Sequence, residues 1–481
     1  MFALLRQQPR PFFMIFILEM WERFGFYTVQ GILVLYFIRY LGFSSQVAYQ
    51  TFGAFSALIY SMVPLGGFLG DKILGTKRTI VLGLIVLALG YGALAWVDKA
   101  HIFVALGLIC VGNGLFKANP ATLLAKCYGE DTQVLHTGFT LYYMAINLGA
   151  IVALFIGPAV SSRYGYSSTY IISVIGILLG LANYWFQRQH IADINTAMDQ
   201  TAIRWPRWIL TMLTVVGMMI MATYLLQHVD IARLLICITV AILVSFYFWC
   251  MYKEQKVERS RLLLVFILML EAVIFFTLYQ QMPTSINLFA VQNVHPVLLG
   301  ISVDPQTFQV LNPLWIIVVS PFLAGFYSYL QQKQISFPVP YKFALGMAFG
   351  GISFLILSLA RYVHDSQGMV SSGWLVGSYL FQSLGELMVS ALGIAMVAEL
   401  VPSRIMGFVM GMWFLTTAMG GFTGAAVASY TAMPTSLQPG LESLMVYTGV
   451  FAGIGLVTLA IACVLGLIAP RLTRLMNVRF V

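Results

Sequence analysis

Near its start the chain reads Glu19-Met20-Trp21-Glu22-Arg23-Phe24-Gly25-Phe26-Tyr27, within an otherwise apolar run long enough to cross a bilayer as one helix. Ionisable side chains at that depth are costly unless they face water or a partner. In a helix Glu19, Arg23 and Tyr27 recur every four residues, and Glu22 lies one turn from Glu19, so all four share a face. We interpret this face as part of a transport path in which the surplus carboxylate carries a proton. A structural ion pair between neighbouring helices is the alternative.

The composition indicates an integral membrane protein. Hydrophobic residues make up 60% of the 481 residues and charged residues 9%, against about 25% charged in an average soluble domain. The net charge of +9 is spread between apolar runs, so we expect the lipid bilayer as a partner and no nucleic acid. The five cysteines and six histidines show no metal-ligand spacing, so we expect no metal, no cofactor and no enzyme activity. The charged first run predicts a retained helix instead of a removable signal peptide.

Apolar runs of spanning length predict an all-α polytopic protein with fourteen transmembrane helices. They lie at about 12–38, 48–70, 79–97, 101–125, 137–160, 166–187, 207–228, 231–252, 262–291, 307–330, 341–362, 373–400, 405–430 and 444–469. The run 262–291 is expected to break near Pro283. With this topology, 19 Lys and Arg residues fall on the side of both termini and 5 on the other, which predicts cytoplasmic termini in the cytoplasmic (inner) membrane of a cell.

The longest polar connections flank a helix pair that carries no embedded charge. We therefore expect an N-terminal six-helix bundle at 1–190, a linker with an inserted transmembrane helix pair at 191–260, and a C-terminal six-helix bundle at 261–481.

The loop Gly66–Arg78, after the second span, is rich in glycine and charge. Its glycines let helices approach closely, its acid can accept from a cation or a helix N-terminus, and its bases fix the turn at the membrane face. The positions that we expect to act in this way are Gly67, Asp71, Lys72, Gly75, Lys77 and Arg78. Neither the spacing nor a preceding strand fits a phosphate-binding loop. The segment resembles the loop signature between helices 2 and 3 of the major facilitator superfamily.

Three stretches together resemble the proton-coupled oligopeptide transporter family: Glu19–Tyr27, Gly66–Arg78 and Phe139–Ala150. Likeness continues at 116–120, 281–285 and 384–387, so it covers essentially the whole chain. It extends to the family's bacterial di- and tripeptide permeases, which also carry an inserted helix pair. The resemblance implies the major facilitator fold with a site between two six-helix bundles, alternating access, and uptake of di- and tripeptides with protons.

A short peptide is a zwitterion, so a cavity that accepts many sequences should hold its two ends. Arg23 and Lys117 are the only cations that lie away from the ends of the predicted spans, and they are placed to hold the carboxylate. Glu386 is placed to hold the amine, with Asn312 as its neutral partner. For Lys117 the alternative is a lysine that snorkels to the interface.

The family resemblance adds further site residues. Asn147 and Asn312 match positions that hydrogen-bond the peptide, and Tyr27, Tyr60 and Trp413 match aromatic positions that line the pocket. For each aromatic, ordinary packing is the alternative.

Proton coupling is expected to work by competition for Arg23. Burial favours the neutral form of Glu19 and Glu22, while the arginine favours their carboxylates. Protonation of the pair frees Arg23 for the peptide carboxylate, so proton and peptide favour the same state. Glu386 is also expected to take part in proton coupling. One proton moving through about 100 mV and about one pH unit supplies about 2.3 plus 1.4 kcal/mol, enough for a few-hundred-fold accumulation.

Several positions depart from the family pattern or remain open. Gln30 and Gln280 stand where several members have an arginine and an acid, which predicts a neutral amide contact in place of a gate ion pair. Phe26 stands where many relatives have tyrosine. Glu271 is either a second titrating site or held by a structural hydrogen bond, and Glu399 is a gate or a loop anchor.

The alternative function is a major facilitator proton-coupled transporter of a non-peptide solute, such as a drug, nitrate or an amino-acid-like compound. The pairing of Arg23 and Lys117 with Glu386 in opposite halves favours peptides. We expect a monomer.

Overall fold

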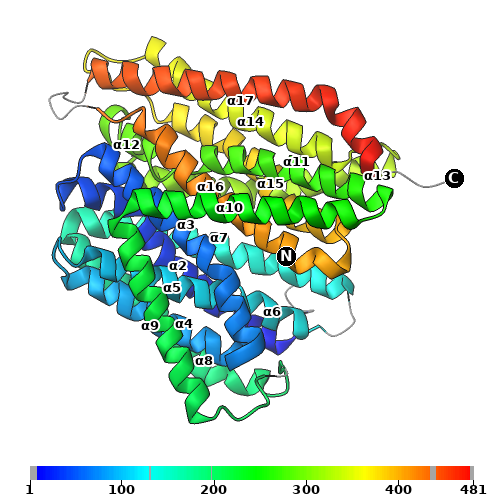
Figure 1. Ribbon diagram of the computed structural model, residues 1–481. Helices are drawn as coiled ribbons and strands as arrows, with labels where there is room; N and C mark the ends of the chain where they lie inside the picture. The colour runs from blue at the N-terminus through cyan, green and yellow to red at the C-terminus, as the bar shows by residue number, and fades with distance from the viewer. Residues whose placement is uncertain (1–7, 129–131, 197, 434–439, 477–481) are drawn as a thin grey trace. The chain divides into compact units, whose positions relative to one another are not determined.

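The computed structural model describes residues 8–128, 132–196, 198–433 and 440–476, and these are almost entirely helical (Figure 1). Thirteen stretches of the described chain are long and apolar enough to cross a membrane. Helix α2 (Arg10–Arg39) adds a fourteenth, because its 30 residues are interrupted only by the charges of its polar face. Each of the fourteen predicted spans corresponds to one of these stretches. The chain is a multi-pass membrane protein, and the predicted all-α fold class is confirmed.

The chain divides into two compact units, which are residues 1–42 with 54–232, and residues 43–53 with 233–481. The first unit contains α2, most of α3 (Ser45–Leu69), a π-helix (Gly70–Leu74), α4 (Thr76–Trp96), α5 (Ile102–Lys117), α6 (Asn119–Lys126), α7 (Thr132–Tyr164), α8 (Tyr166–Gln187), a 3-10 turn (Arg188–Ile191) and α9 (Trp205–Gln227).

The second unit contains most of α10 (Val229–Lys253), then α11 (Lys256–Tyr279), α12 (Ser285–Asn293), the antiparallel strands β1 (Val297–Leu298) and β2 (Ile301–Ser302), a 3-10 turn (Pro305–Val310), α13 (Leu311–Gln332), α14 (Val339–Leu359), a 3-10 turn (Ala360–Tyr362), α15 (Gly373–Leu400), α16 (Ser403–Ser429) and α17 (Leu441–Met476). The predicted three-part division, with 191–260 as a separate insertion, stays a prediction.

Helix α2 is enclosed by its neighbours in the first unit, since it packs along α7 and α8. Small residues allow this approach. A side chain on Gly149 of α7 would meet the backbone of Met20 and the Cβ atom of Arg23, and one on Gly176 of α8 would meet the ring of Phe24. The polar face of α2 therefore lies inside the unit and away from lipid.

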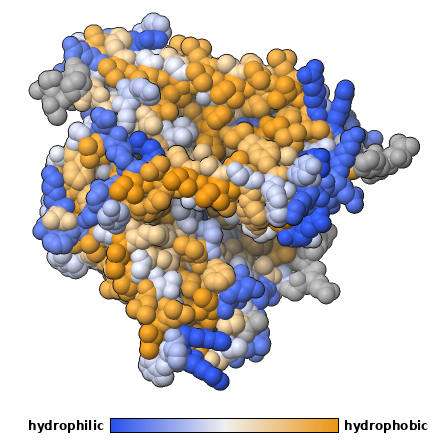
Figure 2. Space-filling model, in the orientation of Figure 1, coloured by the Kyte–Doolittle hydropathy of each residue, from blue (hydrophilic) through white to orange (hydrophobic). Residues whose placement is uncertain are grey.

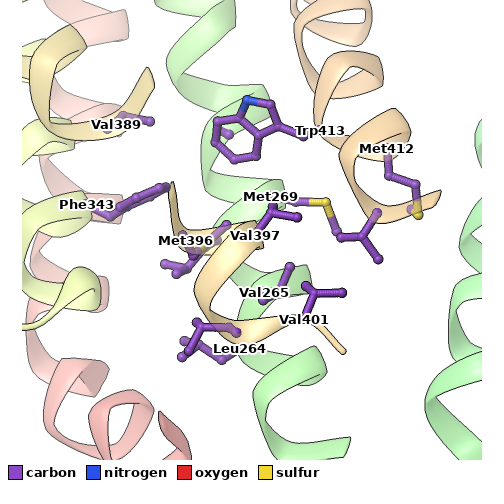
Figure 3. Packing of buried hydrophobic residues seen from close by; sticks show 14 of the residues in the cluster. Leu264, Val265, Met269, Phe343, Val389, Met396, Val397, Val401, Met412 and Trp413 are labelled. Atoms are coloured by element: carbon purple, nitrogen blue, oxygen red, sulfur yellow. The ribbon is translucent and has the colours of Figure 1, made fainter. Parts of the chain in front are cut away.

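Helices α11, α14, α15 and α16 form the apolar core of the second unit. Figure 3 shows part of it, where Val265 and Met269 of α11 lie beside Val397 of α15 and Trp413 of α16. Apolar side chains also cover much of the surface (Figure 2). The exposed ones on α10 and α17 include Ile242, Phe246, Leu456, Val457, Val464 and Leu467. Such continuous apolar exposure fits contact with lipid.

The predicted break within 262–291 is confirmed, because α11 ends at Tyr279 and α12 begins at Ser285. Gln281 supports the intervening turn. Its Nε2 donates to the carbonyl of Thr277 and to that of Gly424 on α16, each at 2.9 Å, and its Oε1 accepts from Ser285 at 2.7 Å. The side chain of Gln281 thus bonds the turn to α16 and also satisfies the carbonyl of Thr277, which the end of α11 leaves free.

Candidate functional site

The charged face of α2 forms one buried cluster. Arg23 pairs with Glu22 at 2.5 Å and with Glu19 at 3.3 Å, and the exposed fractions of the three residues are 3%, 0% and 2%. The spacing prediction that these side chains share a face is confirmed by these contacts. Two acids around one base leave the cluster with a surplus negative charge when both acids are ionised, which a proton can neutralise.

Neighbouring helices complete the cluster. Tyr142 of α7 donates its hydroxyl to Glu19 at 2.7 Å, and Asn113 of α5 donates its amide to Glu22 at 3.4 Å. The guanidinium of Arg23 lies 5.1 Å from the ring centroid of Phe26. Phe26, where many relatives have tyrosine, therefore serves as a cation–π face for the arginine.

Lys117 is the last residue of α5 and stands where the span breaks before α6. Its ammonium lies 4.2 Å from the ring centroid of Tyr60 on α3, so the structure brings these two predicted site residues together. The side chain of Asn119 donates to the carbonyls of Leu115 and Gly66, at 2.6 and 3.3 Å. The side chain of Asn119 thus satisfies carbonyl groups at the break between α5 and α6. Lys117 lies at this break, within the span Ile102–Lys126, and is partly exposed.

Two further predicted residues of the first unit lie on the same helices. Asn147 of α7 is buried, and its amide donates to the carbonyl of Tyr143 at 2.9 Å, which leaves its side-chain oxygen to accept a bond. Tyr27 is partly buried, one helical turn beyond Arg23.

In the second unit, Glu386 of α15 accepts a hydrogen bond from Asn312 of α13 at 2.8 Å. Both residues are 7% exposed. Ser383, one turn before Glu386, accepts from the amide of Asn312 and donates to its carbonyl, each at 3.2 Å. The predicted neutral partner of Glu386 is thus in place, and Ser383 holds that partner in position.

Trp413 lies within the apolar core (Figure 3). It is 3% exposed, packs edge-on against Phe276 at a centroid distance of 6.3 Å, and fills the space beside Gly393, where an added side chain would overlap the indole. The structure favours the packing alternative for this residue.

The loop Gly66–Arg78 is bonded to the connection that follows α8. The backbone N–H of Lys77 donates to Asp199 at 3.1 Å, and the ammonium of Lys77 donates to the carbonyl of Ile191 and the side chain of Asn195. Arg78 donates to the carbonyls of Met198 and Thr201 at 3.3 and 3.0 Å.

Two glycines of the loop are required by its geometry. Gly75 has φ of +90°, which favours glycine, and it faces Asp199. Gly66 contacts the backbone of Gly114 on α5, whereas Gly67, the predicted contact glycine, has room beside it. Asp71 and Lys72 are exposed, and among the described residues neither makes a hydrogen bond or ion pair, so the acid that accepts from the loop is Asp199 and not Asp71.

Glu271 and Glu399, whose roles the sequence left open, differ in burial. Glu271 of α11 is 3% exposed, and neither carboxyl oxygen has a hydrogen-bond partner among the described residues, so a structural hydrogen bond does not hold it. Glu399 is exposed, and Arg404 pairs with Glu254 and Glu258 instead. Gln30 and Gln280 lie in different units, so the expected amide contact between them stays a prediction.

Sequence reasoning missed Tyr142, Asn113, Ser383 and Asp199. Tyr142 lies within the quoted stretch 139–150, so its signal was available but could not be linked to Glu19 from spacing alone. Ser383 lies three residues before Glu386, on the same helix face. Asp199 gave no signal, because it stands in a polar connection without a motif.

Comparison with known proteins gives full-length matches. A model described as the POT family matches residues 77–446. The dipeptide and tripeptide permease B of Salmonella typhimurium LT2 is 46% identical over 475 residues, covering 98% of this chain and 97% of that protein. The dipeptide and tripeptide permease B of Yersinia enterocolitica is 47% identical over 476 residues, with coverage of 98% and 97%.

Solved structures agree over the same length. A crystal structure of tetrameric PepTSo2 is similar with a TM-score of 0.87 and 32% identity, covering 97% of this chain and 99% of that one. A structure described as a bacterial homologue of the human drug peptide transporters PepT1 and PepT2 gives a TM-score of 0.86 and 32% identity, with coverage of 97% and 99%.

Proposed function

Because the chain belongs to the POT family, we propose that it is a proton-driven symporter that takes up di- and tripeptides across the membrane. The observation that carries this is the 46–47% identity over 98% of the chain to proteins named dipeptide and tripeptide permease B. The chain is a transporter of the major facilitator fold and not an enzyme. Its coupling ion is the proton, and the activity requires no cofactor.

The proposed site for the peptide carboxylate consists of Lys117 and Arg23. Lys117 is partly exposed and lies over the ring of Tyr60, and no hydrogen bond or ion pair engages its three N–H donors among the residues that the structure describes. Arg23 is occupied by Glu19 and Glu22. Lys117 is therefore the cation that a carboxylate meets first.

The proposed site for the peptide amine is Glu386. Its hydrogen-bond donor Asn312 is a neutral amide, and an arriving ammonium could take the place of that donor. We assign Asn147 and Asn312 to hydrogen bonds with the peptide, and Tyr27 and Tyr60 to the lining of the pocket.

Proton coupling is proposed to operate through Arg23. Protonation of Glu19 or Glu22 removes an ion-pair partner of the arginine, which then binds the peptide carboxylate. Proton and peptide stabilise the same state, and this positive linkage drives symport. Full pH-dependent uptake by Glu22→Gln would refute this role.

We further propose that the protein lies in the cytoplasmic (inner) membrane with both termini in the cytoplasm. The excess of Lys and Arg in the connections on that side supports this orientation. The proposed transport unit is a monomer, in which 1–190 and 261–481 act as two six-helix bundles and 191–260 contributes the inserted pair.

The test is uptake of labelled dialanine into liposomes that contain the purified protein, with an imposed inward proton gradient. Lys117→Ala and Glu386→Gln remove the two proposed end contacts. Lys333→Ala and Glu442→Gln are matched controls, because each changes an exposed residue of the same type.

We expect gradient-driven accumulation by the wild type and both controls, and its loss in both site variants. Accumulation retained by Lys117→Ala or by Glu386→Gln would refute that residue's role. A folded wild type that does not take up dialanine, but admits protons with another solute, would refute the peptide substrate.

A further inference from the structure

Glu271 differs from every other buried acid described in the spans. Glu19 and Glu22 are paired with Arg23, and Glu386 accepts from Asn312. Glu271 is equally buried, at 3% exposure, yet neither of its carboxyl oxygens has a hydrogen-bond partner among the described residues. Neither the family's peptide site nor the proton cluster on α2 accounts for it.

The position of Glu271 on α11 shows what it faces. Phe275 and Leu278 lie four and seven residues further along, on the same helix face. The ring of Phe275 reaches to 3.1 Å from the place of a side chain on Gly385 of α15, and Leu278 reaches to 3.0 Å at Gly350 of α14. Glu271 therefore points from α11 toward α14 and α15, one turn from the close contact at Gly385.

The residues beside Glu271 along α11 are apolar. Leu268, Met269 and Ala272, next to it on α11, belong to the buried hydrophobic core. Figure 3 shows Met269 in this layer with Val397 of α15.

The charged groups on the elements around α11 are engaged elsewhere or exposed. Glu386 of α15 is held by Asn312, and Glu399 at the far end of that helix is exposed. On α14, the ammonium of Lys342 lies over the ring of Tyr327. The remaining groups near the helix ends are Arg404 of α16 with its partners Glu254 and Glu258, Lys253 of α10, and Glu442, Arg471 and Arg474 of α17. None of them hydrogen-bonds to Glu271.

An ionised carboxylate in such a place would lack both a counter-ion and a donor, which strongly favours the neutral acid. Even the neutral acid leaves its O–H donor without an acceptor, so its burial is still unfavourable. The cost of burying the carboxylate and the cost of the unpaired O–H donor both fall when the contact of α11 with α14 and α15 loosens and water reaches the carboxyl. Its protonation is thus linked to the packing of three helices.

We propose that Glu271 is a second proton-binding site, protonated while α11 is packed against α14 and α15 and deprotonated when that packing opens. The step is a simple acid dissociation, with the proton taken from and returned to water. Its contribution to transport rests on the proposed function. Together with the α2 cluster it gives two protons for each peptide, and loss of Glu271 removes one.

The first test needs no substrate. Infrared difference titration of the purified protein measures the stretching band of protonated carboxyl groups, in wild type, Glu271→Gln and the exposed control Glu442→Gln. We expect one component of this band, separate from that of Glu19 and Glu22, to persist to a higher pH than the exposed acids allow. This component should be absent in Glu271→Gln and unchanged in Glu442→Gln. Identical spectra in wild type and Glu271→Gln would overturn the proposal.

The second test measures how many protons accompany each peptide. In liposomes, the membrane potential that halts net flux shifts by about 59 mV per tenfold peptide gradient for one coupled charge and by about 30 mV for two. We expect the smaller shift in wild type and Glu442→Gln and the larger one in Glu271→Gln. At about 100 mV and one pH unit this lowers the limiting accumulation roughly 500-fold. An unchanged shift in Glu271→Gln would refute the role in coupling.

Glu271→Leu is a control that separates loss of the proton site from loss of folding. Replacing an unpartnered acid by an apolar residue of similar length should leave a monodisperse protein with an unchanged or higher unfolding midpoint, and it should lack the infrared band as Glu271→Gln does. If the wild type shows the band but does not transport dialanine, the peptide function fails and the proton site stands.

Discussion

Adjacent glycines at the end of α3 should respond in opposite ways to the same substitution. A side chain on Gly66 would overlap the carbonyl of Gly114 and come within 2.7 Å of the Cα atom of Leu115. A side chain on Gly67 would meet nothing nearer than the Cβ atom of Ala118 at 3.6 Å, an ordinary contact. We therefore expect Gly66→Ala to destabilise the protein and Gly67→Ala to leave it unchanged or more stable.

The magnitudes follow from what each methyl group meets. At Gly66 the obstacles are backbone atoms of α5, which cannot rotate away, so the helices must separate at a cost of about 1–3 kcal/mol. At Gly67 the methyl group meets no obstacle, and alanine gains about 0.5–1 kcal/mol over glycine inside a helix. The two variants should thus differ by on the order of 3 kcal/mol, although their compositions are identical.

The assay is thermal unfolding of the two purified variants in the same detergent, followed by dialanine uptake. Because α3 and α5 also carry Tyr60 and Lys117, separating them should weaken the cation–π contact, and Gly66→Ala should lower uptake while Gly67→Ala retains it. Equal unfolding midpoints, or a lower midpoint for Gly67→Ala, would refute the close approach of α3 to α5.

Three further outcomes are expected. Asp199→Ala removes the acceptor of the Lys77 backbone N–H, a loss of about 1 kcal/mol. Hydrogen exchange at 188–204 should become faster, while the midpoint of global unfolding stays nearly unchanged. Unchanged exchange would contradict the hydrogen bond from Lys77 to Asp199. The backbone N–H of Met369 lowers the pKa of Asp365 below its ordinary 3.8, so the protection of the loop at 363–372 is present above pH 3.8 and is lost as the pH falls through the lowered pKa. In Asp365→Asn the backbone amides of this loop should exchange faster than in wild type only at pH values where the wild-type carboxyl is ionised. A difference in exchange that persists in acid would be evidence that the ionised carboxylate does not protect the loop. Trp413→Ala should cost about 3–5 kcal/mol in stability and leave the KM of the folded fraction unchanged, whereas a residue that mainly binds peptide would show the reverse.

The spans could be predicted from the sequence because bilayer thickness alone sets the length of an apolar helix. The break near Pro283 and the shared face of Glu19 and Arg23 followed from local rules of the same kind. Each of these features depends on residues a few positions apart.

Partners that are distant in the sequence could not be predicted. Tyr142 donates to Glu19 across 123 positions, and Asp199 accepts from Lys77 across 122. Gly66 and Gly67 are equivalent in sequence, and only the backbone of α5 distinguishes them. Trp413 matched a pocket position of the family, but whether an aromatic ring packs or lines a cavity depends on neighbours that spacing does not reveal.

The buried acids differ in what holds them, and this difference separates their roles. Glu19 and Glu22 share Arg23, so a proton or a carboxylate that arrives there changes the same ion pairs, and we propose that these acids respond to substrate. Glu386 accepts a hydrogen bond from a neutral amide, and we propose that an arriving ammonium replaces this amide. Neither carboxyl oxygen of Glu271 has a hydrogen-bond partner among the described residues, so we propose that its protonation follows the packing of α11 instead of peptide binding. On this proposal Glu19 and Glu22 respond to the peptide, and Glu271 responds to the conformation. A symporter gains from both, because each class of site alone leaves one way for proton or peptide to cross without the other.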